Sequence, residues 1–327
     1  MTAGGKRTRL LGTVWALAAA ILLVSCITVE TPPAGKRPLK VGWTTWTGWY
    51  PMAIAQELKL FEKHGVAVEP ILYNNYTEVL PDISSGKLDG GFSGLYEVLK
   101  ANISDIKVVL ATDYSDGAEG LVVIGSIRKP RDLKGKRIGI QGAMSGSEFL
   151  ITTFLRKHRI EPRDLTFLNV SPEAVLDRMP VHIQGGYTWD PFLSQAIKKG
   201  YRLMFTTADM KGMVVDVVAF QGNIVKSRGD DLRKFVSAWF EAEEYWRRHP
   251  DDAARIIAKV TGLKREEIKR DGCRIFTRED NLRTFKPGED FSSIYYTARK
   301  QAEFFISIGD TSTLPDIEKI LTPAFLQ

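Results

Sequence analysis

The chain has 327 residues, is 44% hydrophobic and carries a formal net charge of +6 at pH 7. This length is enough for one large or two medium domains with hydrophobic cores of their own. The positive charge is no argument for nucleic-acid binding, because removal of residues 1–25, which hold Lys6, Arg7 and Arg9, lowers the net charge from +6 to +3.

The first 25 residues have the pattern of an export signal. Basic residues precede an apolar run from Leu10 to Val24, which is shorter than the roughly 20 residues of a membrane-spanning helix. The run ends in "LVSC", which resembles a bacterial lipobox. We expect residues 1–25 to be a lipoprotein signal peptide, Cys26 to carry the lipid and residues 26–38 to form a tether. An uncleaved signal anchor is the alternative.

This pattern predicts an exported protein, lipid-anchored at the cell membrane or in the periplasm. Once Cys26 carries a lipid, Cys273 is the one cysteine left, so an intrachain disulfide cannot form. The folded part must then be stabilised by its core, and Cys273 is expected to be an inert, partly buried thiol.

From Leu39 onward, short apolar runs typical of strands alternate with amphipathic stretches typical of helices. A helix is expected at 52–65, and a helix, a turn and a strand within 77–94. The rhythm restarts at residue 128, and the chain after residue 222 is expected to be helical. The runs that predict further strands are 38–45, 66–73, 106–115, 120–126, 136–142, 201–209 and 213–222.

This order predicts an α/β protein with largely parallel sheets, divided into two lobes with a helical C-terminal tail. Residues 39–127 together with 214–327 are expected to form the first lobe and the tail. Residues 128–213 are expected to form the second lobe. The strands near 120–127 and 214–221 are the expected connections between the lobes.

The blocks "VGWTTWTGWYPMAIAQELKLFEKHGV", "SGKLDGGFSG", "DLKGKRIGIQ" and "TWDPF" carry a resemblance that extends from about Leu39 to the C-terminus. The chain resembles substrate-binding proteins of the nitrate/taurine/sulfonate (NitT/TauT) class of ABC importers, including SsuA/THI5-like and NMT1-like proteins. The resemblance implies a periplasmic-binding-protein type II fold, whose two lobes close on a small solute. It also implies an ABC permease and its ATPase as partners, and no cofactor, metal or nucleic acid.

The run "VGWTTWTGWYP", residues 41–51, provides the first candidate binding residues. Ligands of open α/β sheets bind beyond the carboxyl ends of strands, and Pro51 suits the first turn of the following helix. Trp43 lies inside the predicted strand and is expected to be structural. Trp46, Trp49 and Tyr50 follow it on a polar loop, and we expect Trp46 or Trp49 to face the solute.

Further strand-to-helix turns supply the other candidates. Ser145 and Ser147 open a helix, where they can offer donors to a polar group or simply cap the helix. Asp216 interrupts an apolar strand, so its carboxylate needs a partner, either a hydrogen bond between the lobes or a cationic ligand. The remaining candidates, for which a solvated loop is the competing interpretation of each acid, are Ser93, Tyr96, Asp113, Thr188, Trp189 and Asp190.

These turns hold no Lys or Arg in the segments 41–51, 92–97, 112–120, 141–149 and 185–192. A desolvated sulfonate or nitrate is usually bound by Arg or by several strong donors. The charge pattern therefore favours an amine, a guanidino compound or a pyrimidine-like solute, stacked on Trp and hydrogen-bonded to Asp. The resemblance favours a sulfonate, taurine or nitrate, and an arginine reaching in from elsewhere, such as Arg128 or Arg178, would support that alternative.

Signals for an enzyme are sparse, and no catalytic residue is proposed. The four histidines lie apart in the sequence without metal-ligand spacing, and no phosphate-binding G-x-x-x-x-G-K-[ST] motif occurs. We expect the protein to be an extracytoplasmic solute-binding lipoprotein of an ABC importer. A sensor module that binds solute and docks on a membrane receptor is the alternative.

Overall fold

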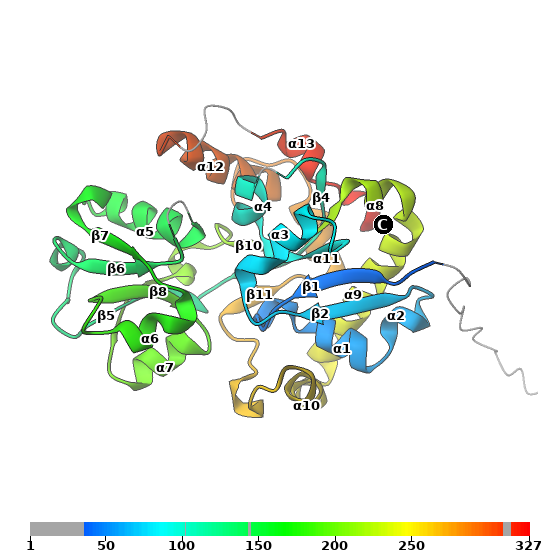
Figure 1. Ribbon diagram of the computed structural model, residues 1–327, viewed down its shortest axis with the longest axis horizontal. Coiled ribbons are helices and arrows are strands. Elements are labelled where there is room, and N and C mark those ends of the chain that lie inside the picture. The colour runs from blue at the N-terminus through cyan, green and yellow to red at the C-terminus, as the bar shows by residue number, and fades with distance from the viewer. Residues whose placement is uncertain (1–35, 102, 143–144, 310–314) are drawn as a thin grey trace, which may run out of the picture.

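The computed structural model describes residues 36–101, 103–142, 145–309 and 315–327, which form two lobes around two β-sheets (Figure 1). The expected signal peptide, the lipidation site Cys26 and the tether up to residue 35 lie outside the described residues. Within the described part, no helix is long and apolar enough to cross a membrane. The expected two-lobed α/β architecture is confirmed, with its helical C-terminal tail.

The first lobe is built on a six-stranded sheet in the order β11-β4-β10-β3-β1-β2. Its strands are β1 (Leu39–Trp43), β2 (Val68–Leu72), β3 (Gly90–Gly94), β4 (Ile106–Ser115), β10 (Val215–Gln221) and β11 (Cys273–Ile275). Its helices are α1 (Pro51–Glu57), α2 (Leu60–Lys63), α3 (Val79–Ser84), α4 (Leu95–Ala101), α8 (Gly222–Ser227), α9 (Gly229–Arg248), α10 (Pro250–Thr261), α11 (Arg278–Thr284), α12 (Ile294–Ser307) and α13 (Ile317–Ile320).

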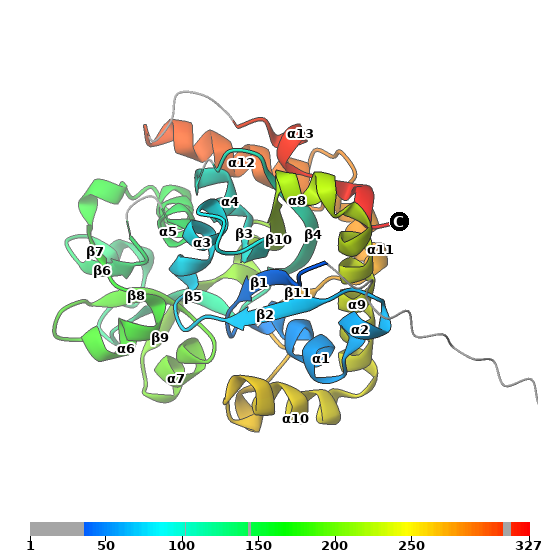
Figure 2. The same ribbon diagram turned by 45° about the vertical axis from the view of Figure 1, so that its right-hand side comes forward.

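The second lobe is built on a five-stranded sheet in the order β7-β6-β8-β5-β9. Its strands are β5 (Glu119–Val123), β6 (Arg137–Ile140), β7 (Thr166–Asn169), β8 (Gly185–Trp189) and β9 (Arg202–Thr206). Its helices are α5 (Gly146–Lys157), α6 (Val175–Arg178) and α7 (Phe192–Lys198). In both ribbon views the second lobe, in green, lies beside the first, and α12 reaches across toward α5 (Figure 2).

The sheets are mixed, where we expected largely parallel ones. Strands β2, β1 and β3 are mutually parallel, and so are β7, β6 and β8. The other ladders are antiparallel. The reason lies in the exchange of strands between lobes: β4 leads out of the first sheet and β10 leads back into it, so the two run in opposite directions.

The connection between the lobes lies earlier than we expected. Strand β5 pairs with β8 and β9 of the second sheet, so the chain changes sheets at residues 116–118 and not near Ile127. The return connection runs through residues 207–214, close to the expected boundary. The two connections touch each other, because the Ser115 Oγ lies 2.7 Å from the Thr207 Oγ1, which also accepts the Gly117 N–H at 2.9 Å.

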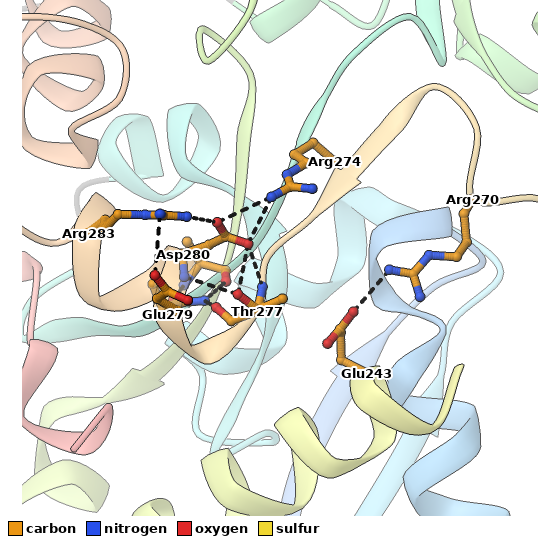
Figure 3. A network of polar contacts seen from close by, with 9 residues as sticks. Glu243, Arg270, Arg274, Thr277, Glu279, Asp280 and Arg283 are labelled. Carbon is orange, nitrogen blue, oxygen red and sulfur yellow. Dashed lines mark hydrogen bonds and ion pairs between the residues drawn. The ribbon is translucent and has the colours of Figure 1, made fainter. Parts of the chain in front are cut away.

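Strand β11 is a further correction, because we expected the chain after residue 222 to be helical. This short strand pairs with β4 and brings Cys273 opposite Ser115. Polar contacts fix it on both sides (Figure 3): Arg270 donates to Glu243 of α9 at 3.0 Å, and Arg274 lies 3.3 Å from Asp280 of α11. This edge strand is too short to form many backbone hydrogen bonds, so ion pairs help to hold it in place.

Candidate ligand-binding site

A cavity of about 240 Å³ lies between the lobes, at the carboxyl ends of strands of both sheets. Its walls come from the turns after β1, β3 and β8, from the start of α5 and from Met213 and Val214 of the return connection. Aromatic, hydroxyl and carboxyl side chains make up most of the polar lining. The lining includes Trp46, Trp49, Tyr76, Tyr96, Glu97, Glu119, Ser147, Glu173, Tyr187, Trp189, Asp216 and Gln301.

The three tryptophans of the opening turn divide as the sequence suggested. Trp43 is fully buried in the core of the first lobe, whereas Trp46 and Trp49 line the cavity. The Trp49 ring lies 5.8 Å from the Tyr76 ring at an interplanar angle of 27°. From the second lobe, the Trp189 ring approaches Tyr76 edge-on at 6.3 Å. The cavity therefore has aromatic walls from both lobes, suited to a flat or cationic group.

Asp113 lies directly behind this wall and holds Trp46 in place. Its carboxylate accepts the Trp46 Nε1–H at 3.1 Å, the Thr112 hydroxyl at 2.7 Å and the Cys273 thiol at 2.8 Å. Asp113 is fully buried and does not line the cavity. Burial raises its pKa and, to a larger degree, the pKa of the Cys273 thiol, so Cys273 is a neutral donor to this network.

Asp216 joins the Asp113 network to the cavity. In the sheet, Asp216 lies between Gly94 of β3 and Asp113 of β4, and its side chain lines the cavity. Burial, followed by the charge of Asp113, raises the pKa of Asp216 well above its usual range. Two adjacent buried carboxylates cannot both ionise easily, so Asp216 holds the proton and donates to Asp113.

Glu119 is the first residue of β5 and lines the cavity. It accepts the Tyr187 hydroxyl at 2.7 Å, and the Ser115 hydroxyl, part of the lobe connection, also hydrogen-bonds to it. Burial raises the pKa of Glu119 to about 7, with smaller contributions from the charges of Asp113 and Glu97. Near neutral pH this carboxyl therefore changes its charge readily when a charged group approaches.

Glu97 adds a further carboxyl on the side of the first lobe. It lies at the start of α4 with its carboxyl oxygens close to two glycines: an added Cβ would lie 2.3 Å from Oε2 at Gly94 and 3.0 Å from Oε1 at Gly146. Burial raises the pKa of Glu97. Gly146 belongs to the second lobe, so Glu97 spans the cleft.

The lining has no positive side chain to balance these acids. None of the described residues that line the cavity is Lys, Arg or His. Arg128 and Arg178, which could have brought a positive charge, are exposed and do not belong to the lining. The cavity therefore offers several carboxyl groups without a counter-charge, and a solute with a positive charge would favour the ionised form of each.

Two polar atoms of the wall have no partner within the described part of the chain. They are the indole nitrogen of Trp49 and the Oε1 of Gln301, and both side chains are 2% exposed. The Gln301 amide nitrogen is fixed, because it donates to the Met213 carbonyl at 2.9 Å. Buried polar groups normally find a partner, so the wall offers one donor and one acceptor to a bound solute.

The structure gathers about half of the predicted site residues at the cavity. The predicted residues that line it are Trp46, Trp49, Tyr96, Ser147, Trp189 and Asp216. The Tyr50 ring instead packs at 5.8 Å from the Trp246 ring. Ser93 is buried within β3, 3.4 Å from the Tyr76 hydroxyl. Like Asp113, neither reaches the cavity.

The remaining predicted residues have local structural contacts. Ser145 caps α5, with its hydroxyl accepting the Glu148 N–H at 3.3 Å. The Thr188 hydroxyl donates to the Pro172 carbonyl at 2.7 Å. Asp190 accepts the Ser194 N–H at 2.9 Å, at the start of α7. These side chains shape the turns that carry the lining residues, and they do not line the cavity.

Several lining residues were missed from the sequence. Glu119 directly precedes the predicted strand 120–126, and this place next to an apolar run is a signal for burial. Glu97 directly follows the predicted Tyr96 and could have been found from it. Tyr76 and Gln301 carry no such signal, because each lies on a segment that reaches the site only through the tertiary fold.

Comparisons with known proteins agree with this architecture. A binding protein of Brucella abortus (strain 2308) is 24% identical over 286 residues, which are 83% of this chain and 86% of that protein. The taurine-binding periplasmic protein of Escherichia coli (strain K12) is 23% identical over 233 residues, 67% of this chain and 72% of that protein.

A solved structure shares the fold. The alkanesulfonate-binding protein SsuA from Xanthomonas axonopodis pv. citri, bound to MOPS, superposes with a TM-score of 0.71 at 18% identity, covering 88% of this chain and 99% of that chain. The resemblance to the NitT/TauT class is thereby confirmed. The sequence matches the NMT1-like family over residues 32–262, and the chain therefore belongs to the NMT1-like family.

Proposed function

We propose that the protein is the solute-binding component of an ABC-type importer. In this role it captures a small polar solute between its lobes and presents it to a permease driven by an ATPase. The observation that carries the proposal is the cavity between two lobes of a fold shared with periplasmic solute-binding proteins. The contact between the two lobe connections, Ser115 with Thr207, is a suitable place for a hinge motion that closes the lobes.

We further propose that the solute carries an amine, a guanidino group or a protonated heteroaromatic ring. The support is the lining itself, in which Glu97, Glu119, Glu173 and Asp216 occur and no cationic side chain does among the described residues. A cation can stack on Trp46, Trp49 or Trp189 and pair with Glu119. A sulfonate placed there would face buried carboxyl groups without a counter-charge.

Export and lipid anchoring at Cys26 belong to the same proposal. Their support is the lipobox-like "LVSC" after a short apolar run and the sequence similarity to a protein named as periplasmic. A lipid on Cys26 would keep the binding protein at the membrane that holds its permease. Metabolic labelling with a clickable fatty acid should mark the wild type and leave Cys26→Ser unlabelled, whereas equal labelling of both would contradict the anchor.

A thermal-shift screen of the chain from Thr28 onward tests the solute class. One panel contains taurine, alkanesulfonates and nitrate, and the other contains amines, guanidino compounds and pyrimidines. A solute present at 100 times its Kd stabilises the fold by about 2.7 kcal/mol, which gives a clear shift in Tm. We expect stabilisation only within the second panel. Stabilisation by a sulfonate or nitrate alone would overturn the proposed charge preference, and the absence of any binder in either panel would count against solute capture.

A further inference from the structure

Two side chains of α12 hold the return connection between the lobes. The Thr297 hydroxyl donates to the Gly212 carbonyl at 2.9 Å. One turn further along the helix, the Gln301 amide nitrogen donates to the Met213 carbonyl at 2.9 Å. Both side chains are buried, and both carbonyls belong to the connection 207–214. Of the two side chains, only that of Gln301 also lines the cavity.

Gln301 uses one end of its side-chain amide for this contact. A backbone carbonyl can only accept, so the amide nitrogen must face Met213 and the amide oxygen is the end left over. The Gln301 Oε1 has no hydrogen-bond partner among the described residues, and the residue is only 2% exposed. Buried polar atoms normally have a partner. An unpaired acceptor in a side chain that lines a cavity therefore points to a partner supplied by the bound solute.

The contact with Met213 also prepares this acceptor for binding. An amide that is anchored at its nitrogen needs little further ordering when its oxygen accepts a hydrogen bond, so less entropy is lost when a solute binds. The oxygen can accept only from an N–H or O–H group, and its hydrogen bonds are strongest when the donor is ionised. A group that presents only oxygen acceptors gains nothing at this position.

We infer that Gln301 is a specificity-determining residue, whose Oε1 accepts a hydrogen bond from an ammonium or guanidinium N–H of the solute. The inference rests on the proposed solute-binding function and narrows its class of solute. A quaternary ammonium group carries the positive charge but has no N–H to donate. The carboxyl groups of the lining attract either kind of cation through its charge, whereas the amide oxygen of Gln301 distinguishes between them.

The experiment is isothermal titration of benzylamine and benzyltrimethylammonium into the wild type, Gln301→Met and Thr297→Val. Both compounds carry a positive charge and an aromatic ring, but only benzylamine has N–H groups. We expect the preference for benzylamine to fall at least about tenfold in Gln301→Met, the size of one charge-assisted hydrogen bond. Thr297→Val should keep the preference of the wild type, because it loses a hydrogen bond to the lobe connection and none to the solute.

The outcomes separate the inference from the proposed function. An unchanged preference in Gln301→Met with its Tm preserved would overturn the inference, and so would an equal fall in both variants. The bulk of the methyl groups cannot imitate the expected result, because it disfavours benzyltrimethylammonium in all three proteins. Binding of neither compound by the wild type would overturn the proposed class of solute, and the inference with it.

Spectroscopy of the wild type covers the case in which Gln301→Met does not fold. A charge-assisted hydrogen bond polarises the carbonyl group that accepts it, so the resonance of the isotope-labelled side-chain carbonyl carbon of Gln301 should shift on saturation with benzylamine. Saturation with benzyltrimethylammonium should leave this resonance close to its position in the free protein. No shift with benzylamine, or equal shifts with both compounds, would overturn the inference.

Discussion

Gly48 and Asp113 approach each other so closely that Asp113 can hold Trp46 only if residue 48 has no side chain. A Cβ on Gly48 would lie 1.7 Å from the Asp113 Oδ1, and Asp113 cannot move away without losing the Trp46, Thr112 and Cys273 hydrogen bonds. The packing behind the cavity wall is therefore as specific as the wall itself.

This close contact predicts the effect of Gly48→Ala. Overpacking a buried site typically costs about 1–3 kcal/mol, and we expect a loss of this size in the free energy of unfolding, measured by urea denaturation. The matched control is Gly125→Ala, because a Cβ on Gly125 has no atom within 4 Å. Its effect should stay within about 0.5 kcal/mol. Equal stability of the two variants would show that Asp113 is not fixed as described.

Glu119 gives a second prediction, for the dependence of stability on pH. Burial raises its pKa to about 7 from a model-compound value of 4.5, so the folded state holds a proton that the unfolded state releases between these two pH values. Stability then falls as pH rises through this window, by up to about 1.4 kcal/mol per pH unit. The loss is complete about one pH unit above this folded-state pKa.

Glu119→Gln removes this titration and keeps an acceptor for the Tyr187 hydroxyl. We expect the free energy of unfolding of the wild type, relative to this variant, to fall by about 2–3 kcal/mol between pH 5 and pH 8 in the absence of solute. Parallel curves for the two proteins would contradict a raised pKa at Glu119. Chemical denaturation at several pH values measures the difference directly.

At the scale of elements, the turn before β11 forms two backbone hydrogen bonds with the connection between the lobes. The Gly272 carbonyl accepts the Asp116 N–H at 2.8 Å and the Ala118 N–H at 2.9 Å. Gly272 has φ +80°, and a Cβ there would lie 2.8 Å from the Ala118 backbone nitrogen. This turn thus needs a glycine, both for its backbone conformation and for its close approach to Ala118.

Gly272→Ala should therefore lower the stability of the protein by more than backbone strain alone would. The matched control is Gly200→Ala, which has φ +86° and no atom within 4 Å of an added Cβ. Both variants adopt the left-handed conformation at a cost of about 1–2 kcal/mol, and Gly272→Ala should lose about 1–3 kcal/mol more from the clash. Equal values of Tm for the two variants would contradict a close contact between Gly272 and the lobe connection.

The elements also show what the sequence could predict. The longer strands stand out as apolar runs, and the rhythm of strands and helices was enough for the two-lobed fold. The predicted helix 52–65 instead forms α1 and α2, separated at Lys59, which adopts φ 52°. Strand β11 has only three residues, and its pairing with β4 and its ion pairs come from tertiary contacts that local patterns do not carry.

At the scale of the whole molecule, both lobes contribute residues to the site. Turn positions beyond strand ends were predictable, and the turn after β1 does deliver Trp46 and Trp49 to the cavity, which Trp189 at the end of β8 and Asp216 near the start of β10 also line. What the sequence lacked was the relation between lobes: Glu97 reaching Gly146, or Gln301 of α12 reaching the wall. Such pairs lie far apart in the chain, and only the tertiary fold brings them together.

A cavity whose described lining has carboxyl groups and no cationic side chain should select a positively charged solute. The most direct measurement is isothermal titration of two matched heteroaromatic compounds, one with an aminomethyl group and one with a hydroxymethyl group. We expect the aminomethyl compound to bind at least about tenfold more tightly at pH 8. Its advantage should shrink as the pH falls below about 7, where Glu119 takes up its proton. Equal affinities at both pH values, or tighter binding of taurine than of either compound, would contradict the account.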